Sequence, residues 1–128
     1  MNLIVFPGQG SQKIGMGKEM SENFIEAKEV FEEVDDAIDF SLSKIMWESS
    51  DYDIALTSNA QPALMACGVA VYRVLNKLTN KKLPDLADYI CGHSFCAFSA
   101  SFESFPVMFH FVSFVFYFAF CIFRFFHF

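Results

Sequence analysis

The stretch NLIVFPGQGSQ at residues 2–12 decides the fold class of this chain. Residues 2–6 are mainly apolar, β-branched or aromatic, and the run ends at Pro7-Gly8. A short run of this kind that ends in turn residues is typical of a buried strand. The glycine-rich segment that follows, residues 8–12, continues to Gly15-Met16-Gly17. We therefore expect a fully buried strand over residues 2–6 that opens into a glycine-rich loop.

Two helices are predicted next along the chain. Residues 22–39 carry apolar side chains at steps of three and four, with acids between them, which indicates an amphipathic helix. The expected core stripe of this helix is Phe24, Ala27, Phe31, Val34 and Ile38. Ser21 precedes it and is the expected N-cap. A shorter helix is expected over residues 42–47.

A third helix and a second strand follow. Residues 51–59 are expected to form a loop, and the helix to begin near Pro62, because proline is favoured in a first turn. Its expected apolar stripe is Leu64, Cys67, Val71, Leu75 and Leu78. A polar segment over residues 76–85 leads to a buried strand over residues 86–91, which ends at Gly92-His93-Ser94. The order strand, helices, strand predicts an α/β domain with a parallel sheet.

Length and charge restrict the class of protein. The 128 residues suffice for one domain with one core. A net charge of −6 argues against a non-specific nucleic-acid binder, which requires a basic face. The first residues lack the basic region and the long apolar run of a signal peptide, so the reducing cytoplasm is the expected compartment. Cys91, His93 and Cys96 lack a second ligand pair with zinc-type spacing, so no metal site is predicted.

Composition changes abruptly at Ser94/Phe95. Of the 18 phenylalanines, 14 lie in residues 95–128, and only Glu103 and Arg124 carry charge there. This contrast predicts two segments, residues 1–94 and a phenylalanine-rich tail over residues 95–128.

The loop after the first strand was tested against two phosphate-binding patterns. A dinucleotide fingerprint requires a third glycine where Lys13 stands, and a P-loop requires a lysine where Met16 follows Gly15. Both patterns fail. A strand followed by backbone N–H groups on a flexible turn remains, and this arrangement suits an oxyanion hole as well as a phosphate.

Gly92-His93-Ser94 follows the second predicted strand. A serine on a sharp turn from strand to helix is the geometry of a nucleophile elbow, whose full pattern is G-x-S-x-G. Cys96 stands where that pattern has its last glycine. Taken alone, the three residues are therefore compatible with an ordinary turn or with a nucleophile.

Three motifs in order resemble the malonyl-CoA:acyl carrier protein transacylases and the related acyltransferase domains of polyketide synthases. They are FPGQGSQ at residues 6–12 with GMG at residues 15–17, TSNAQPAL at residues 57–64, and GHS at residues 92–94. The resemblance covers residues 1–94. It implies the amino-terminal part of an α/β-hydrolase-like acyltransferase domain, with the family's small ferredoxin-like subdomain missing.

The resemblance also assigns roles. Ser94 matches the nucleophile, and the backbone N–H groups of Gln9 and Phe95 match the oxyanion hole. His93 stands beside the nucleophile but is not the catalytic base, and Gln61 matches a glutamine near the site. The implied reaction moves malonyl from malonyl-CoA to the phosphopantetheine thiol of acyl carrier protein, in fatty-acid synthesis, through a malonyl-serine ester. No cofactor is implied.

The family pattern LGEYSA after the serine becomes FCAFSA at residues 95–100. Neither the family's malonyl-binding arginine nor its catalytic histidine has a matching position, because Arg124, His110 and His127 lie in unrelated sequence. Loss of the base of a serine triad costs on the order of 10⁴- to 10⁶-fold in rate. We therefore expect the truncated chain to be inactive alone.

Three interpretations of the tail remain open. The first is a frameshift or rearrangement after codon 94, because phenylalanine codons are T-rich. The second is a membrane segment: residues 104–122 carry no charge and come close to the ~20 residues that span a bilayer, so any membrane association is expected only through residues 104–123. The third is an interaction or aggregation segment, because the phenylalanines at residues 114–120 recur at every second position. A small membrane-associated or interaction protein that reuses the fragment, and a degraded gene product without function, are the alternatives to an enzyme.

Overall fold

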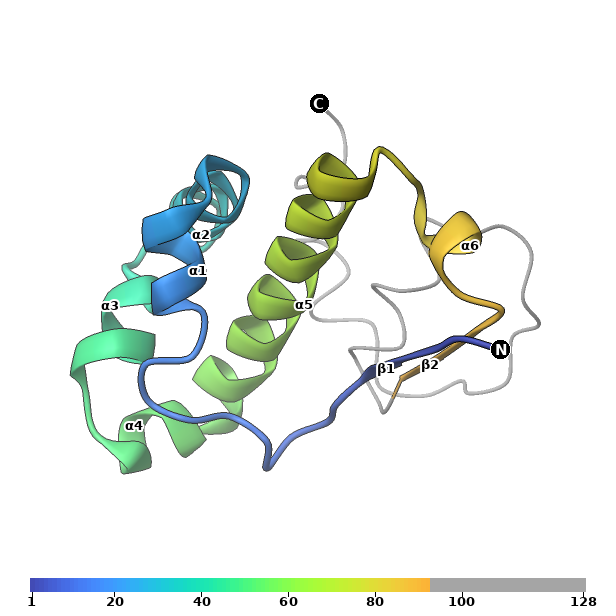
Figure 1. Cartoon of the computed structure of the whole chain (residues 1–128). Coiled ribbons are helices and arrows are strands. Elements are labelled where there is room, and N and C mark those ends of the chain that lie inside the picture. The colour runs from blue at the N-terminus through green and yellow to red at the C-terminus, as the bar shows by residue number, and fades with distance from the viewer. Residues whose placement is uncertain (93–128) are drawn as a thin grey trace.

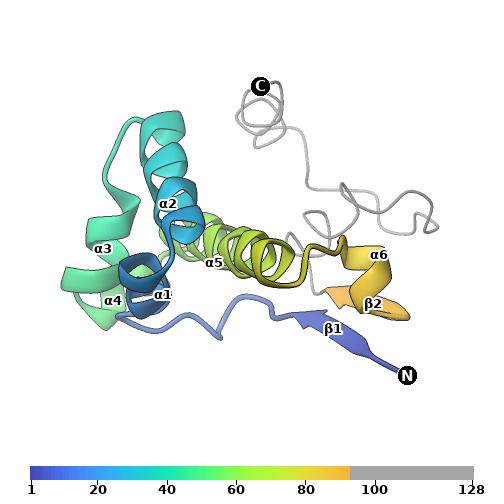
Figure 2. The same ribbon diagram turned by 45° about the horizontal axis from the view of Figure 1, so that its top comes forward.

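The computed structural model describes residues 1–92. The elements in chain order are β1 (Leu3–Phe6), α1 (Lys18–Asn23), α2 (Ile25–Ile38), α3 (Leu42–Glu48), α4 (Asp51–Ala55), α5 (Thr57–Thr79), α6 (Leu83–Leu86) and β2 (Tyr89–Gly92). The long helix α5 lies between two groups of elements, with α1 to α4 on one side and β1, β2 and α6 on the other (Figures 1 and 2). The predicted α/β class is confirmed.

The two strands form a parallel sheet. Their register pairs Leu3 with Tyr89 and Phe6 with Gly92, so both carboxyl ends lie at the same end of the sheet. Leu3 and Val5 are 54% and 61% exposed, whereas the alternate residues of β1 are half-buried. The prediction of a fully buried first strand is therefore wrong for the described residues, because only one face of the strand packs on α5. The second strand begins at Tyr89 rather than at residue 86.

The predicted helix over residues 22–39 is two helices. Phe24 has extended backbone angles (φ −130°, ψ 122°) and separates α1 from α2, and Ser21 lies inside α1 instead of capping a helix. The break turns the half-buried Phe24 side chain onto the core. The predicted stripe is otherwise largely confirmed, because Ala27, Phe31 and Val34 are buried.

Residues 51–59 are not a loop. Ser50 and Asp53 form a capping box that starts α4, in which the Asp53 N–H donates to Ser50 Oγ at 3.2 Å. The next helix, α5, already begins at Thr57, so Pro62 lies inside it rather than in its first turn. The Asn59 side chain donates to the Asp53 carbonyl at 2.8 Å and links the two helices. The short helix predicted over residues 42–47 is confirmed as α3.

The core lies where α2, α3 and α5 meet. The face of α5 that packs on α2 consists of small residues at helical spacing: Ala63, Ala66, Ala70 and Val74. The stripe predicted for this helix is wrong at Val71 and Leu78, which are 46% and 65% exposed, whereas Cys67 packs against the core. Small side chains allow the two helix backbones to approach closely. The side of α5 that faces α2 is therefore lined by small residues and not by the large apolar residues of the helix.

The polar segment over residues 76–85 contains the end of α5 and most of α6. The helix α5 ends at Thr79 and is capped by Asn80, which has left-handed backbone angles (φ 54°, ψ 33°), and Pro84 stands in the first turn of α6. Within residues 1–92, no helix is long and apolar enough to cross a membrane.

Candidate active site

The turn after β1 is held by its own hydrogen bonds. The backbone N–H and the hydroxyl of Ser11 both donate to the Gly8 carbonyl, at 3.3 and 2.7 Å. The Gly10 N–H donates to Gln12 Oε1 at 2.7 Å, and Gly10 has φ +105°, a region that L side chains rarely adopt. The loop is therefore a defined turn and not a loose connection.

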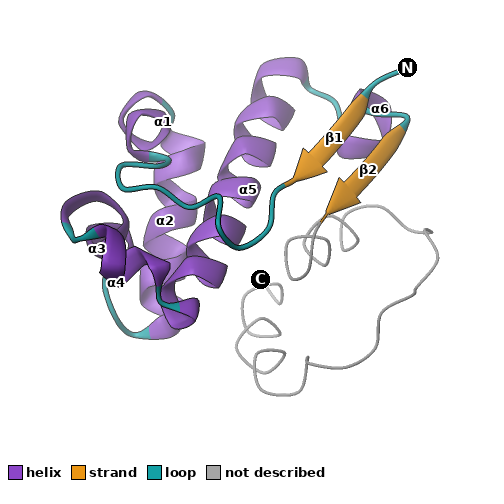
Figure 3. Cartoon of the chain, turned by 90° about the horizontal axis from the view of Figure 1, so that it is seen from below, coloured by secondary structure: helices purple, strands orange, loops and turns teal. Residues whose placement is uncertain are grey.

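One side-chain hydrogen bond ties this turn to α5. Gln9 Nε2 donates to Thr57 Oγ1 at 3.0 Å, across 48 residues of sequence. Gln61 is half-buried one helical turn beyond Thr57, so both lie on the same face of α5. Seen from below, the loop runs past α5 before it joins β1 (Figure 3). The structure thus brings two of the predicted site residues, Gln9 and Gln61, to neighbouring positions around Thr57.

The sheet register decides where the two predicted motifs leave the sheet. Phe6 precedes the glycine-rich turn and pairs with Gly92, the last residue of β2. The Phe6 ring rests on α5 at Gly68, where an added Cβ would lie 3.1 Å from Phe6 Cδ1. His93, Ser94 and Phe95 follow Gly92 in the sequence and lie outside the described residues, as do the tail and its predicted membrane segment.

The GMG motif at residues 15–17 belongs to the packing of the loop. The Gly15 N–H donates to the Met46 carbonyl at 2.8 Å, and Trp47 Nε1 donates to the Met16 carbonyl at 3.0 Å. Gly17 has φ +78°, and a Cβ there would lie 2.6 Å from Phe31 Cζ. The motif therefore fixes the path from the turn to α1.

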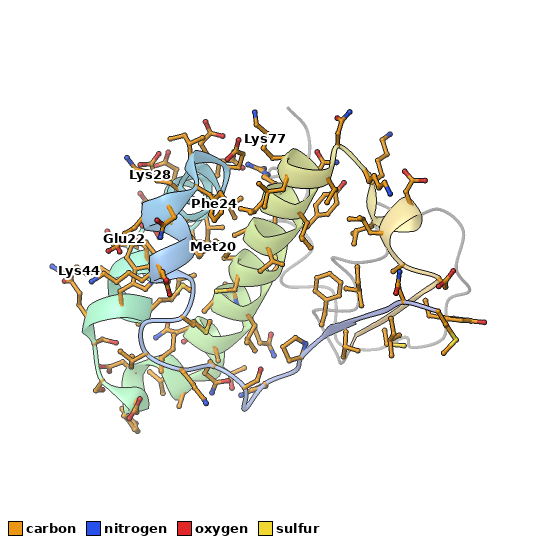
Figure 4. The ribbon with its side chains drawn as sticks, viewed as in Figure 1. Met20, Glu22, Phe24, Lys28, Lys44 and Lys77 are labelled. Carbon is orange, nitrogen blue, oxygen red and sulfur yellow. The ribbon has the colours of Figure 1, made fainter. Side chains whose placement is uncertain are left out.

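The charged side chains labelled in Figure 4 lie on the outside of the group of helices α1 to α5. Met20 and Phe24 fill the space between α1 and α5, whereas Lys28, Lys44 and Glu22 project outward (Figure 4).

Cys67 is the one described thiol next to the core. Burial raises its pKa to about 12, because the thiolate would lose its hydration. A thiol with so high a pKa stays protonated and is a poor nucleophile. Residues 1–92 contain no group of three or more histidine, cysteine, aspartate or glutamate side chains that could hold a metal ion.

The sequence analysis gave Thr57 no role, although it belongs to the second motif. A sequence signal was present, because Thr57 and Gln61 are four residues apart, which is the spacing of neighbours on one helix face. The predicted loop over residues 51–59 hid this relation, since a shared helix face exists only if Thr57 is itself helical.

Comparison with known proteins identifies the class. The acyl transferase domain family matches residues 3–104, and the chain belongs to this family. The match includes residues on both sides of the composition change at Ser94/Phe95.

The relatives within the family include malonyl transferases and a polyketide synthase. The malonyl CoA-acyl carrier protein transacylase of Bacillus subtilis (strain 168) is 42% identical over 97 residues, which are 76% of this chain and 29% of that protein. The phenolphthiocerol synthesis polyketide synthase of Mycobacterium marinum is 36% identical over 103 residues, and the matched region is 5% of that much longer protein.

Solved structures agree with this class. The acyl-carrier-protein-S-malonyltransferase of Bartonella henselae has a TM-score of 0.73 and 48% identity over 78% of this chain and 32% of its own. A malonyl-transacylase solved in complex with a type II polyketide synthase acyl-carrier protein has a TM-score of 0.67 and 32% identity, over 77% of this chain and 30% of its own. The chain thus spans about a third of the length of the malonyl transferases that it matches.

Proposed function

We propose that this chain is the part of a malonyl-CoA:acyl carrier protein transacylase that carries the nucleophile and the two backbone N–H groups of the oxyanion hole. The observation that carries the proposal is the pairing of Phe6 with Gly92. Because of this pairing, the turn that contains Gln9 and the Gly92-His93-Ser94 motif both begin at the same end of the sheet. Names of the relatives support the malonyl and carrier-protein parts of the proposal.

The proposed reaction has two steps. In the first, Ser94 Oγ attacks the thioester carbonyl of malonyl-CoA, the C–S bond breaks, and CoA leaves as the thiol. In the second, the phosphopantetheine thiol of acyl carrier protein attacks the malonyl-serine ester, and Ser94 regains its proton. The backbone N–H groups of Gln9 and Phe95 stabilise the oxyanion in both steps. His93 and Gln61 line the site without serving as the base.

We also propose that a polypeptide of these 128 residues does not catalyse malonyl transfer by itself. The family's base histidine and malonyl-binding arginine have no matching positions in the sequence. An unpaired malonyl carboxylate and an unassisted serine would each lower the rate by several orders of magnitude.

The test compares two polypeptides with labelled malonyl-CoA and carrier protein. One is the 128-residue chain, and the other joins its residues 1–94 to the part of the Bacillus subtilis transacylase that follows the residue aligned with Ser94. The chimera is expected to transfer malonyl, and the 128-residue chain is not. Ser94→Ala should abolish the acyl-enzyme seen by mass spectrometry, whereas Ser58→Ala, an exposed serine on α5, should leave it unchanged.

Each part of the proposal has its own contrary result. A folded chimera that forms no malonyl-enzyme, or that keeps its activity as Ser94→Ala, contradicts the assignment of the nucleophile. Transfer by the 128-residue chain that disappears in Ser94→Ala contradicts only the proposed inactivity.

We propose that the phenylalanine-rich tail over residues 95–128 is foreign to the family from the end of the matched region, residue 104, onward. Their 14 phenylalanines and two charges support this proposal. The measurement is the nucleotide sequence from codon 85 onward, translated in every frame. A second frame that restores the family pattern, with an arginine and a histidine, would support a frameshift. If no frame restores it, the tail is a coding segment, and the membrane and interaction interpretations are tested next.

A further inference from the structure

The turn at residues 8–12 leaves one amide available. Of three consecutive backbone N–H groups, that of Gly10 donates to Gln12 Oε1 and that of Ser11 donates to the Gly8 carbonyl. The Gln9 N–H has no hydrogen-bond acceptor within residues 1–92. An N–H group stabilises an oxyanion only if nothing else occupies it and if its position is fixed beforehand.

The side chain of Gln9 supplies the fixed position. Its Nε2 donates to Thr57 Oγ1 at 3.0 Å, and Thr57 is the first residue of the 23-residue helix α5. That helix is held by the core, since Ala63, Ala66 and Ala70 on its other side are 0% exposed. The hydrogen bond therefore connects a surface turn to a long helix whose opposite side is packed in the core.

We propose that Thr57 is a positioning residue of the transacylase reaction. Its hydroxyl holds the Gln9 side chain, which keeps the turn in the conformation that leaves the Gln9 N–H open to the oxyanion. The inference rests on the proposed function of the Gln9 N–H. It requires an oxygen at position 57, which serine retains and which valine, of nearly the same shape, lacks.

The first measurement uses the 128-residue chain and amide hydrogen exchange. Thr57→Val should raise the exchange rates of the Gly10 and Ser11 amides by roughly fivefold or more, because the hydrogen bonds that these two N–H groups make within the turn open more easily. Thr57→Ser and the control Ser58→Ala should leave both rates within about twofold. Amides of α5 serve as the internal standard, since unchanged exchange there shows that the fold is intact.

The second measurement uses the chimera described above. Thr57→Val should lower kcat roughly ten- to hundredfold, because the loss of a whole oxyanion donor costs on the order of 10²- to 10³-fold. KM for malonyl-CoA should change by less than about threefold, because the interaction acts in the transition state. Thr57→Ser should restore most of kcat.

The outcomes separate the two proposals. If Ser94→Ala abolishes transfer and Thr57→Val leaves kcat unchanged, the role of Thr57 is refuted and the proposed function stands. If the chimera is inert, the proposed function fails, and with it the role of Thr57. Unchanged exchange of the Gly10 and Ser11 amides in Thr57→Val overturns the positioning role in either case.

Discussion

Gly17 is the position at which the structure predicts the largest effect of one added methyl group. An alanine at this site would keep φ at +78°, and its Cβ would lie 2.6 Å from Phe31 Cζ and 3.0 Å from Cys67 Sγ. The left-handed backbone costs an L residue about 1–2 kcal/mol. Phe31 is 3% exposed and packs edge-on against Trp47, with ring centroids 5.4 Å apart, so it has little room to move. Overpacking of this kind costs about 1–3 kcal/mol.

The two costs together predict that Gly17→Ala lowers the free energy of unfolding by about 2–5 kcal/mol. Gly15→Ala is the matched control, because Gly15 has φ +84° and no atom within 4 Å of the added Cβ. It should lose only the backbone part, about 1–2 kcal/mol. The difference between the two variants therefore measures the contact with Phe31 and Cys67.

Urea unfolding followed by far-UV circular dichroism and by the fluorescence of Trp47, the one tryptophan of the chain, measures both variants. Phe31→Leu removes the crowded ring atom, so Gly17→Ala should cost about 1–2 kcal/mol less in that background. Equal losses for Gly17→Ala and Gly15→Ala, or no coupling to Phe31→Leu, would refute the packing argument.

Two further predictions concern the charged and titratable groups of the helical core. Glu33 accepts two hydrogen bonds of 2.7 Å from Arg73 and links α2 to α5, so Glu33→Gln should cost about 0.5–1 kcal/mol in urea unfolding, and less in molar salt. Glu32→Gln, in a looser exposed pair at 3.6 Å, should cost little, and equal losses would contradict the role of bidentate geometry. Burial raises the pKa of Cys67 from 9.0 to about 12, so its stabilising contribution is complete below pH 9 and is lost as the pH rises toward 12. Relative to Cys67→Ala, the wild-type chain should therefore lose about 1 kcal/mol of stability between pH 8 and pH 10, and parallel pH profiles would contradict this.

Local signals predicted the strands and several helices well. The apolar run before Pro7 and the run before Gly92 are strands, and α3 lies where its periodicity indicated. The Ser50-x-x-Asp53 capping box is a local signal for the start of a helix, so the sequence itself contains evidence against a loop over residues 51–59.

Other features were beyond local sequence. Large apolar side chains were assigned to the buried face of α5, yet the helix turns its alanines toward α2 and leaves Val71 and Leu78 exposed. Which face is buried depends on how closely a neighbouring helix approaches, and that distance is set by both partners. Likewise, the periodicity of residues 22–39 continues across Phe24, and the break there is decided by packing onto the core.

By itself, the sequence determined the α/β class, the family motifs and the candidate residues Gln9, Gln61 and Ser94, because turns and reactive groups require particular residue types at fixed short spacings. Only the tertiary structure decided that Phe6 pairs with Gly92 and that Gln9 meets Thr57 across 48 residues. Register and long-range hydrogen bonds depend on the mutual packing of a sheet and a helix, and no local pattern specifies that packing.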